Sequence, residues 1–256
     1  MRVLRAAGIE PVHYKGAALA DLYPQAALRP YGDFDITVWP HQKAAAESLL
    51  RASGGLAQCD IKDIFDDLPS GGYQEVYGRT RTRLIAGEQL RVLGHEDHLR
   101  LACRHFQRHG GRRALWPCDV ALLLETRPAD FDWAYLLRGP RHEREGVICV
   151  LGLAHSLLDA RLEDTPVWPR ATALPSGLVS SVLHACTHPL SLEAASLRRQ
   201  PHEPLWSLLR RRWFTPLHTA WRFNLSPWSP LVYPLRVARF LRHFLPVRRR
   251  WPFPAR

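Results

Sequence analysis

The hydrophobic pattern of the chain changes near residue 93, and this change constrains the fold more than any other feature. Before that point, short segments of alternating apolar and polar residues are interleaved with short helical segments. In the clearest expected strand, Phe34 and Ile36 alternate with Asp33 and Asp35. After that point, apolar residues recur at helical spacing. The sequence therefore predicts an α+β fold, in which a small mixed β-sheet is followed by an α-helical part.

We expect three domains along the chain. Residues 1–93 form an α/β domain, residues 94–165 a helical domain, and residues 166–256 a helical extension rich in Pro, Trp and Arg. The part after residue 199 holds five of the nine tryptophans and nine of the 21 prolines, so it does not form one long helix. The expected helices are 1–8, 16–22, 42–51, 96–109, 114–126, 133–138, 145–160, 176–187 and 190–199; the expected strands are 9–14, 31–39 and 57–65, with a hairpin at 84–93 around Gly87-Glu88, an acidic loop at 66–72 and a proline-broken linker at 165–175.

The positive charge of the protein is concentrated at its C-terminal end. The net charge is +11, yet residues 197–256 hold 13 arginines and one acid, Glu203, which is a net charge of +12. The rest of the chain is therefore close to neutral. Arginines beside aromatic residues in this segment are typical of a surface for anionic membranes or nucleic acid. The alternative is a helix that packs on the body through Val237 and Leu241 and exposes an arginine face.

Cysteine usage and the lack of long apolar runs bear on the compartment. The five cysteines are scattered and odd in number, which favours a reducing environment over a disulfide framework. The longest apolar run, residues 147–158, is shorter than a membrane span, and the first residues do not resemble a secretory signal. We expect a cytoplasmic protein.

Asp33 and Asp35 are the first candidates for chemistry. Side chains two residues apart on a strand lie on the same face, so both carboxylates point into one space. A divalent cation relieves their repulsion, and hard oxygen ligands suit Mg²⁺. A pair of aspartates on a solvent-facing strand is the alternative interpretation of this short pattern.

Lys15 and Gly16 add a second element to this candidate site. They lie where an expected strand passes into a helix of small residues that begins with Ala17. Free backbone N–H groups at such a junction suit a phosphate, and the Lys15 ammonium adds a point charge. Arg29, four residues before Asp33, is a candidate for holding another phosphate oxygen.

Two blocks of the sequence resemble the uncharacterised nucleotidyltransferase-like family of the polymerase-beta superfamily. The first resembles the family pattern of Lys-Gly and two small residues, then Leu-Arg-Pro, then Gly-Asp and a second Asp on a strand. The second, residues 93–124, is similar to the helical half of that family. The matching segments of the first block are 14–20, 22–23, 28–30 and 32–38.

The resemblance implies that Asp33 and Asp35 bind metal and that a third carboxylate lies on a neighbouring strand. In the family that carboxylate usually belongs to an Asp-Leu-His-Trp segment. Here the nearest match is Asp60 in Asp60-Ile61-Lys62, where lysine replaces histidine and the tryptophan is missing. Asp60 is therefore the predicted third ligand, with Asp63 and Glu75 as alternatives.

The resemblance implies a Mg²⁺-dependent transferase. It would move a nucleoside monophosphate from a nucleoside triphosphate, such as ATP, to the hydroxyl group of a small molecule, sugar or protein. Lys15, Gly16, Ala17 and Arg29 would hold the phosphates. Two alternatives stay open: a catalytically degenerate nucleotide-binding module, and an accessory protein that binds anionic membrane or nucleic acid through residues 197–256.

Histidines are dense in the second block. His98, His105 and His109 share one face of the expected helix at 96–109. A zinc site is one interpretation, but neither paired CxxC nor HExxH spacing accompanies it. Packing of some rings against the sheet and exposure of others is the alternative.

Overall fold

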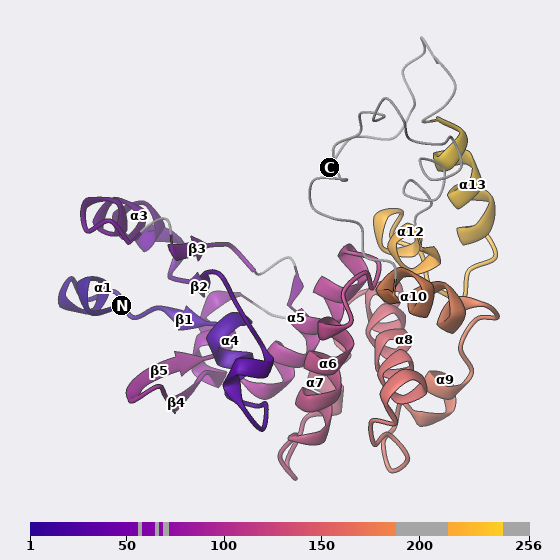
Figure 1. The fold of residues 1–256 in the computed structure, drawn as a ribbon, viewed down its shortest axis with the longest axis horizontal. Helices are drawn as coiled ribbons and strands as arrows, with labels where there is room; N and C mark the ends of the chain where they lie inside the picture. Colours follow the sequence, from indigo (N-terminus) through magenta and orange to yellow (C-terminus); the bar gives the residue numbers. More distant parts are fainter. Residues whose placement is uncertain (56–57, 65–66, 69–71, 188–214, 243–256) are drawn as a thin grey trace.

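The computed structural model describes residues 1–256 except 56–57, 65–66, 69–71, 188–214 and 243–256. It places a mixed β-sheet with short helices at one side of the molecule and a layer of helices at the other (Figure 1). The last strand ends at Val92, and every element described after it is a helix. The predicted α+β class is confirmed, whereas the division into three domains stays a prediction.

In the described part of the chain, the sheet contains five strands in the order β3-β2-β1-β5-β4. β1 pairs antiparallel with β2 and parallel with β5, β2 pairs parallel with β3, and β4 and β5 form an antiparallel hairpin. The strands are β1 (Val12–His13), β2 (Phe34–Thr37), β3 (Cys59–Ile61), β4 (Arg81–Ile85) and β5 (Glu88–Val92).

Alternation along β2 assigns the two faces of the sheet. Ile36 belongs to a buried cluster with Leu4 and Leu50, so α1 and α3 pack on the face that Phe34 and Ile36 share. Asp35 points to the opposite face, because it lies one residue from each. The helices of this region are α1 (Arg2–Ala6), α2 (Gly16–Ala20), α3 (Lys43–Ala52) and α4 (Tyr73–Arg79), with short 3-10 turns at Ala26–Leu28 and Pro40–Gln42.

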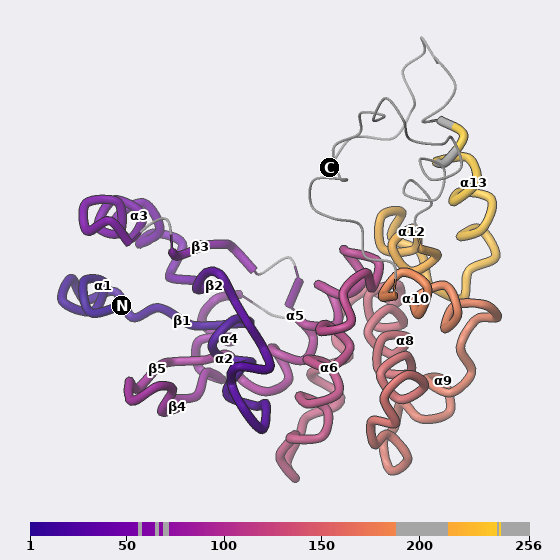
Figure 2. The backbone as a smooth tube through the Cα atoms, in the orientation of Figure 1, coloured from indigo at the N-terminus to yellow at the C-terminus, as the bar shows by residue number. Residues whose placement is uncertain are grey.

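The helical part packs around α5, which follows directly on β5. In Figure 2 the chain passes from the sheet into α5 and then through the neighbouring helices. One large apolar cluster joins these helices and includes Phe106, Leu124 and Leu151, each fully buried. The helices are α5 (His95–Arg108), α6 (Leu115–Glu125), α7 (Trp133–Leu136), α8 (Arg141–Leu158), α9 (Trp168–Thr172), α10 (Leu178–Thr187), α12 (Pro216–Arg222) and α13 (Val232–Arg242).

Three local predictions need correction. The hairpin turns at Ala86-Gly87 rather than Gly87-Glu88. Ala86 and Gly87 both adopt positive φ angles, as a tight two-residue turn requires. A helix, α4, follows the expected acidic loop. The expected linker contains a further helix, α9, which starts with Pro169 in its first turn, where proline is tolerated.

The C-terminal segment is only partly described. α13 exposes Val237 and Leu241, whereas Arg236 and Arg239 are half-buried. The expected packing of this apolar face on the body is therefore wrong for those residues. The expected helix at 190–199 and the arginine clusters at 210–212 and 248–250 lie outside the described residues. No helix in the described part of the chain is long and apolar enough to cross a bilayer.

Candidate functional site

The turn from β1 into α2 has an unusual backbone. Lys15 and Gly16 both have positive φ angles, of 53° and 38°. This conformation is costly for lysine and ordinary for glycine. A Cβ atom on Gly16 would lie 3.2 Å from the carbonyl oxygen of Asp33 and 3.8 Å from the Cβ of Tyr31. Glycine therefore allows the start of α2 to approach the chain entering β2.

The side chain of Lys15 lies against the aspartates. Its Nζ atom is 3.7 Å from Oδ1 of Asp35, and both side chains are largely buried, at 17% and 14% exposed. Burial lowers the pKa of Lys15, and Asp35 opposes that shift. The backbone N–H of Lys15 donates to Nε2 of His98, at 3.1 Å, so α5 supports this turn. α2 has only five residues, so its free N–H groups matter more than a helix dipole.

The register of the sheet brings the predicted carboxylates together. Asp35 lies directly opposite Asp60 in the parallel pair of β2 and β3. Asp33 lies two residues before Asp35, just outside β2, and is exposed. Burial raises the pKa of Asp35, and the negative charges of Asp33 and Asp60 add to the shift. A cation placed among these carboxylates would be stabilised.

A lysine, Lys62, pairs with one of these carboxylates. The ammonium of Lys62 contacts Asp60, so in this structure Lys15 and Lys62 supply the positive charge beside Asp35 and Asp60. Within the described ranges, no group of three or more His, Cys, Asp or Glu side chains is arranged to hold a metal ion. A pair of carboxylates still suits Mg²⁺, which usually binds one or two carboxylates together with water and substrate phosphates.

Tyr14 belongs to the same site and was not predicted. It is 1% exposed, and its hydroxyl has no hydrogen-bond partner among the described residues. Its backbone N–H donates to the carbonyl oxygen of Asp35. Burial raises the pKa of this phenol, and the charges of Asp35 and Asp60 raise it further. The hydroxyl therefore stays protonated and is available as a donor beside the carboxylates.

Two arginines of α5 border the site and were also missed. Arg104 and Arg108 both pair with buried Asp67, which follows β3; the Arg104 Nε–Asp67 Oδ1 distance is 3.6 Å. The charge of Arg108 contributes to lowering the pKa of Lys15. The sequence shows that Arg104 and Arg108 are four positions apart, on one helix face. It does not show that this face lies opposite the segment that follows β3.

Arg29 has a different environment from the one expected for a phosphate ligand. It is 8% exposed, and its Nε and Nη2 atoms donate to the two carboxylate oxygens of Asp119 at 3.1 and 2.9 Å. The hydroxyl of Tyr23 donates to the same carboxylate at 2.8 Å. Arg29 therefore links the segment before β2 to α6. Of the alternative third ligands, Asp63 is exposed, and Glu75 pairs with Arg138 at 2.7 Å.

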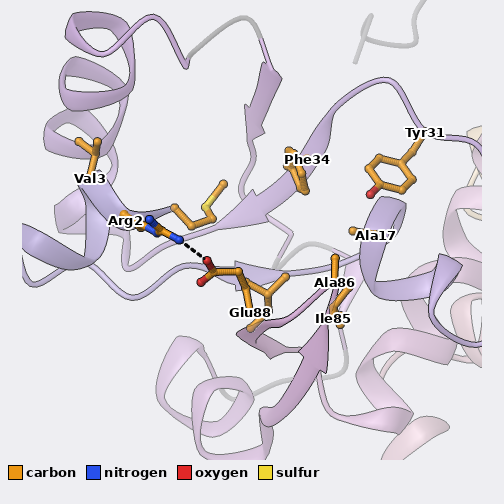
Figure 3. A pocket seen from close by; sticks show the side chains of 10 residues that line it. Arg2, Val3, Ala17, Tyr31, Phe34, Ile85, Ala86 and Glu88 are labelled. Carbon is orange, nitrogen blue, oxygen red and sulfur yellow. Dashed lines mark hydrogen bonds and ion pairs between the residues drawn. The ribbon is translucent and has the colours of Figure 1, made fainter. Parts of the chain in front are cut away.

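An apolar pocket of about 460 Å³ lies on the other face of the sheet. Figure 3 shows Phe34 and Tyr31 beside this pocket, with Ala17 nearby and the Arg2–Glu88 ion pair at its other side. Phe34 faces away from Asp35, so the pocket lies across β2 from that carboxylate, but its lining includes Ala17 and it therefore borders the Lys15-Gly16 turn.

Comparisons with known proteins identify the family of this chain. A search of curated proteins and a search of solved structures each returned no match. The family model described as uncharacterised nucleotidyltransferase matches residues 1–83 and 62–159. Both the Lys15-Gly16 turn and the three aspartates lie in the matched part, as does α5. The match covers more than half of the chain, and the chain therefore belongs to the uncharacterised nucleotidyltransferase family.

Proposed function

We propose that this protein is a Mg²⁺-dependent nucleotidyltransferase that transfers a nucleoside monophosphate from a nucleoside triphosphate to a hydroxyl acceptor. The observation that carries the proposal is the pairing of Asp35 with Asp60, next to the turn at Lys15 and Gly16. The family supports a general nucleotidyltransferase role. In this proposal the Lys15-Gly16 turn binds the phosphates, and the neighbouring carboxylates bind a divalent cation.

The residues of the site have separate roles in this proposal. The backbone N–H groups of Gly16 and Ala17 and the ammonium of Lys15 bind the phosphates. The paired carboxylates of Asp35 and Asp60 would hold Mg²⁺, and Asp33 stays a predicted additional ligand. Bound Mg²⁺ would offset the negative charge of the triphosphate and of the transition state. The Tyr14 hydroxyl donates to a phosphate oxygen, because no other partner is described for it.

The transfer step is a displacement at the α-phosphorus. The acceptor oxygen forms a bond to that phosphorus while the bond to the pyrophosphate oxygen breaks. Asp60 accepts the proton of the acceptor hydroxyl, and pyrophosphate leaves with the electron pair of the broken bond. Asp60 suits this role because it is more exposed than Asp35, at 35% against 14% for the side chains.

The first experiment measures thermal unfolding with ATP, GTP, CTP and UTP, each with and without Mg²⁺. A nucleotide at about 100 times its Kd stabilises the folded chain by about 2.7 kcal/mol, which is several degrees in Tm. We expect this shift to require Mg²⁺ and to disappear in Asp35→Asn. Asp130→Asn, which changes an exposed loop carboxylate, is the matched control and keeps the shift.

Transfer itself is measured as pyrophosphate release over a panel of sugars, small alcohols and proteins. Asp35→Asn lowers the rate by about 100-fold or more, in the range typical for the loss of one catalytic group. A rate and a thermal shift that both survive Asp35→Asn would overturn the proposal.

A second candidate is a nucleotide-binding module without turnover. The contact of Lys62 with Asp60 favours it, because this ammonium competes with both Mg²⁺ and the acceptor proton for the carboxylate. In this case Mg-nucleotide binds, yet no acceptor yields pyrophosphate. Lys62→Ala separates the two functions: pyrophosphate release that begins only in this variant identifies a site suppressed by Lys62.

A further inference from the structure

Three aromatic rings meet where α5 ends and α6 begins. The ring centroids of His105 and His109 are 4.4 Å apart, and those of Trp116 lie 4.9 Å from His105 and 5.1 Å from His109. His109 is exposed, and the other two are half-buried. The guanidinium of Arg113 lies 5.6 Å from the Trp116 ring. We call His105, His109 and Trp116 the ring cluster.

The ring cluster lies on the side of α5 that faces Lys15. His98 accepts a hydrogen bond from the backbone N–H of Lys15. His105 lies seven residues after His98, about two helical turns further along the same face of α5. The positive charge of Lys15 reaches both imidazoles of the cluster. Partial desolvation by the surrounding groups lowers the pKa of the exposed His109 to about 4, and the charges of Arg108 and Lys15 add to the shift.

His105 is neutral for the same reasons. Burial lowers its pKa to about 2, with Lys15 as the next cause. Neutral imidazoles have one donor nitrogen and one acceptor nitrogen and carry no charge to repel Lys15. The cluster thus combines an exposed ring, His109, and two half-buried rings with hydrogen-bonding groups, and aromatic rings of this kind bind a planar heterocycle.

We propose that the ring cluster of His105, His109 and Trp116 binds the base of the nucleoside triphosphate whose phosphates lie at Lys15 and Gly16. This inference rests on the proposed function. The rings are mutually inclined, by 81° between His105 and Trp116, so a base stacked on one ring meets the edge of another. Stacking of this kind tolerates all four bases, so we expect weak base preference.

Other sites fit a base less well. The apolar pocket beside Phe34 reaches Ala17, but its charged lining residues Arg2 and Glu88 pair with each other, and Phe34 faces away from Asp35. A zinc site in place of the cluster would need more ligands than the described residues bring together there. Simple packing of the three rings is the remaining alternative, and the experiment below distinguishes it.

The experiment compares binding of Mg-ATP with binding of Mg-tripolyphosphate, which has the phosphates without the base. Calorimetry gives both dissociation constants for the full chain and four variants. Trp116→Leu and His109→Ala alter the cluster, Lys15→Ala alters the phosphate site, and Trp133→Leu changes a half-buried tryptophan on α7. His109 is exposed, so its variant tests the cluster even if Trp116→Leu unfolds.

In the wild type we expect Mg-ATP to bind more tightly than Mg-tripolyphosphate. Trp116→Leu and His109→Ala weaken Mg-ATP by about 10- to 100-fold and leave Mg-tripolyphosphate unchanged, as expected for loss of one stacking contact. Lys15→Ala weakens both ligands, and Trp133→Leu weakens neither.

Two results overturn the inference while the proposed function stands. One is equal affinity of the wild type for the two ligands, and the other is an affinity difference that survives both cluster variants. Absence of binding of either ligand to the wild type overturns the proposed function and this inference together.

Discussion

The sheet region and the helical region bury their apolar residues in different ways. In the sheet region the buried side chains form three small clusters, built around Ile36, Val12 and Ile85. In the helical region a single continuous cluster runs through α5, α6 and α8 and beyond. A continuous core resists local opening better than separate small ones. The helical region is therefore the rigid support, and the sheet region carries the candidate site.

The boundary between the two regions is polar. α5 buries six polar or charged side chains, although most buried positions elsewhere are apolar; they are Glu96, Asp97, His98, Arg100, Arg104 and Gln107. Four of them contact the sheet region, through Lys15, Asp67 or Arg79, whereas Arg100 and Gln107 contact other helices. Buried charges are tolerated only when they are paired. Arg100 pairs with Glu143 at 2.8 Å and Arg104 with Asp67 at 3.6 Å. These pairs orient the helix that supports Lys15.

The largest effect on stability is expected where Arg29 joins the two regions. Asp119→Ala leaves a buried guanidinium without its carboxylate, which costs about 3–5 kcal/mol of unfolding free energy. Urea unfolding measures this loss. The double variant Arg29→Leu/Asp119→Leu loses less, because neither charge is then buried alone. The half-exposed pair of Arg83 and Asp21 is the control: Asp21→Ala costs less than about 1 kcal/mol. Equal costs for the two pairs would contradict the buried link.

A smaller effect on stability is expected from replacing one glycine in each region by alanine, because the two glycines are packed differently. A Cβ on Gly152 of α8 would lie 2.1 Å from the carbonyl oxygen of Ala171 in α9, whereas a Cβ on Gly78 of α4 meets nothing within 4 Å. Gly152→Ala therefore destabilises by about 1–3 kcal/mol despite its better helix propensity. Gly78→Ala stabilises by about 0.5–1 kcal/mol. Thermal unfolding of both variants checks the opposite signs, and the same sign in both would disprove the difference in packing.

The smallest effect is on the pH dependence of stability. Burial lowers the pKa of His98 to about 3, below its unfolded value of 6.5. The unfolded chain then binds a proton that the folded chain does not, so stability is complete above pH 6.5 and falls toward pH 3. For this one proton the loss is at most about 1.4 kcal/mol per pH unit. Asp97, whose pKa burial raises to about 6, opposes this trend.

Urea unfolding at pH 7 and pH 5 tests this prediction. His98→Gln keeps an acceptor for the Lys15 N–H but cannot titrate, so its stability changes less between the two pH values than that of the wild type. A His41→Gln variant, which alters an exposed histidine, is the control and keeps the wild-type dependence. An unchanged dependence in His98→Gln would assign the acid sensitivity to other groups.

Local hydrophobic patterns were sufficient to predict several of the strands and helices. The alternation of Phe34 and Ile36 with Asp33 and Asp35 predicted β2 and the direction of its side chains, because the period of a strand is local. The helical spacing after residue 93 predicted α5 and α6 within about one residue. α4 was missed because it has only seven residues and follows Gly71-Gly72, although Tyr73, Val76 and Tyr77 have helical spacing.

The sequence by itself determined the fold class, the family and the identity of the aspartate and Lys-Gly motifs, since these depend on residues a few positions apart. Only the tertiary structure decided that Asp60 lies opposite Asp35, that Arg29 pairs with Asp119, and that Tyr14 lies among the carboxylates. Pairing between β2 and β3 and between distant charges depends on how separate elements pack together. Neither local propensity nor spacing contains that information.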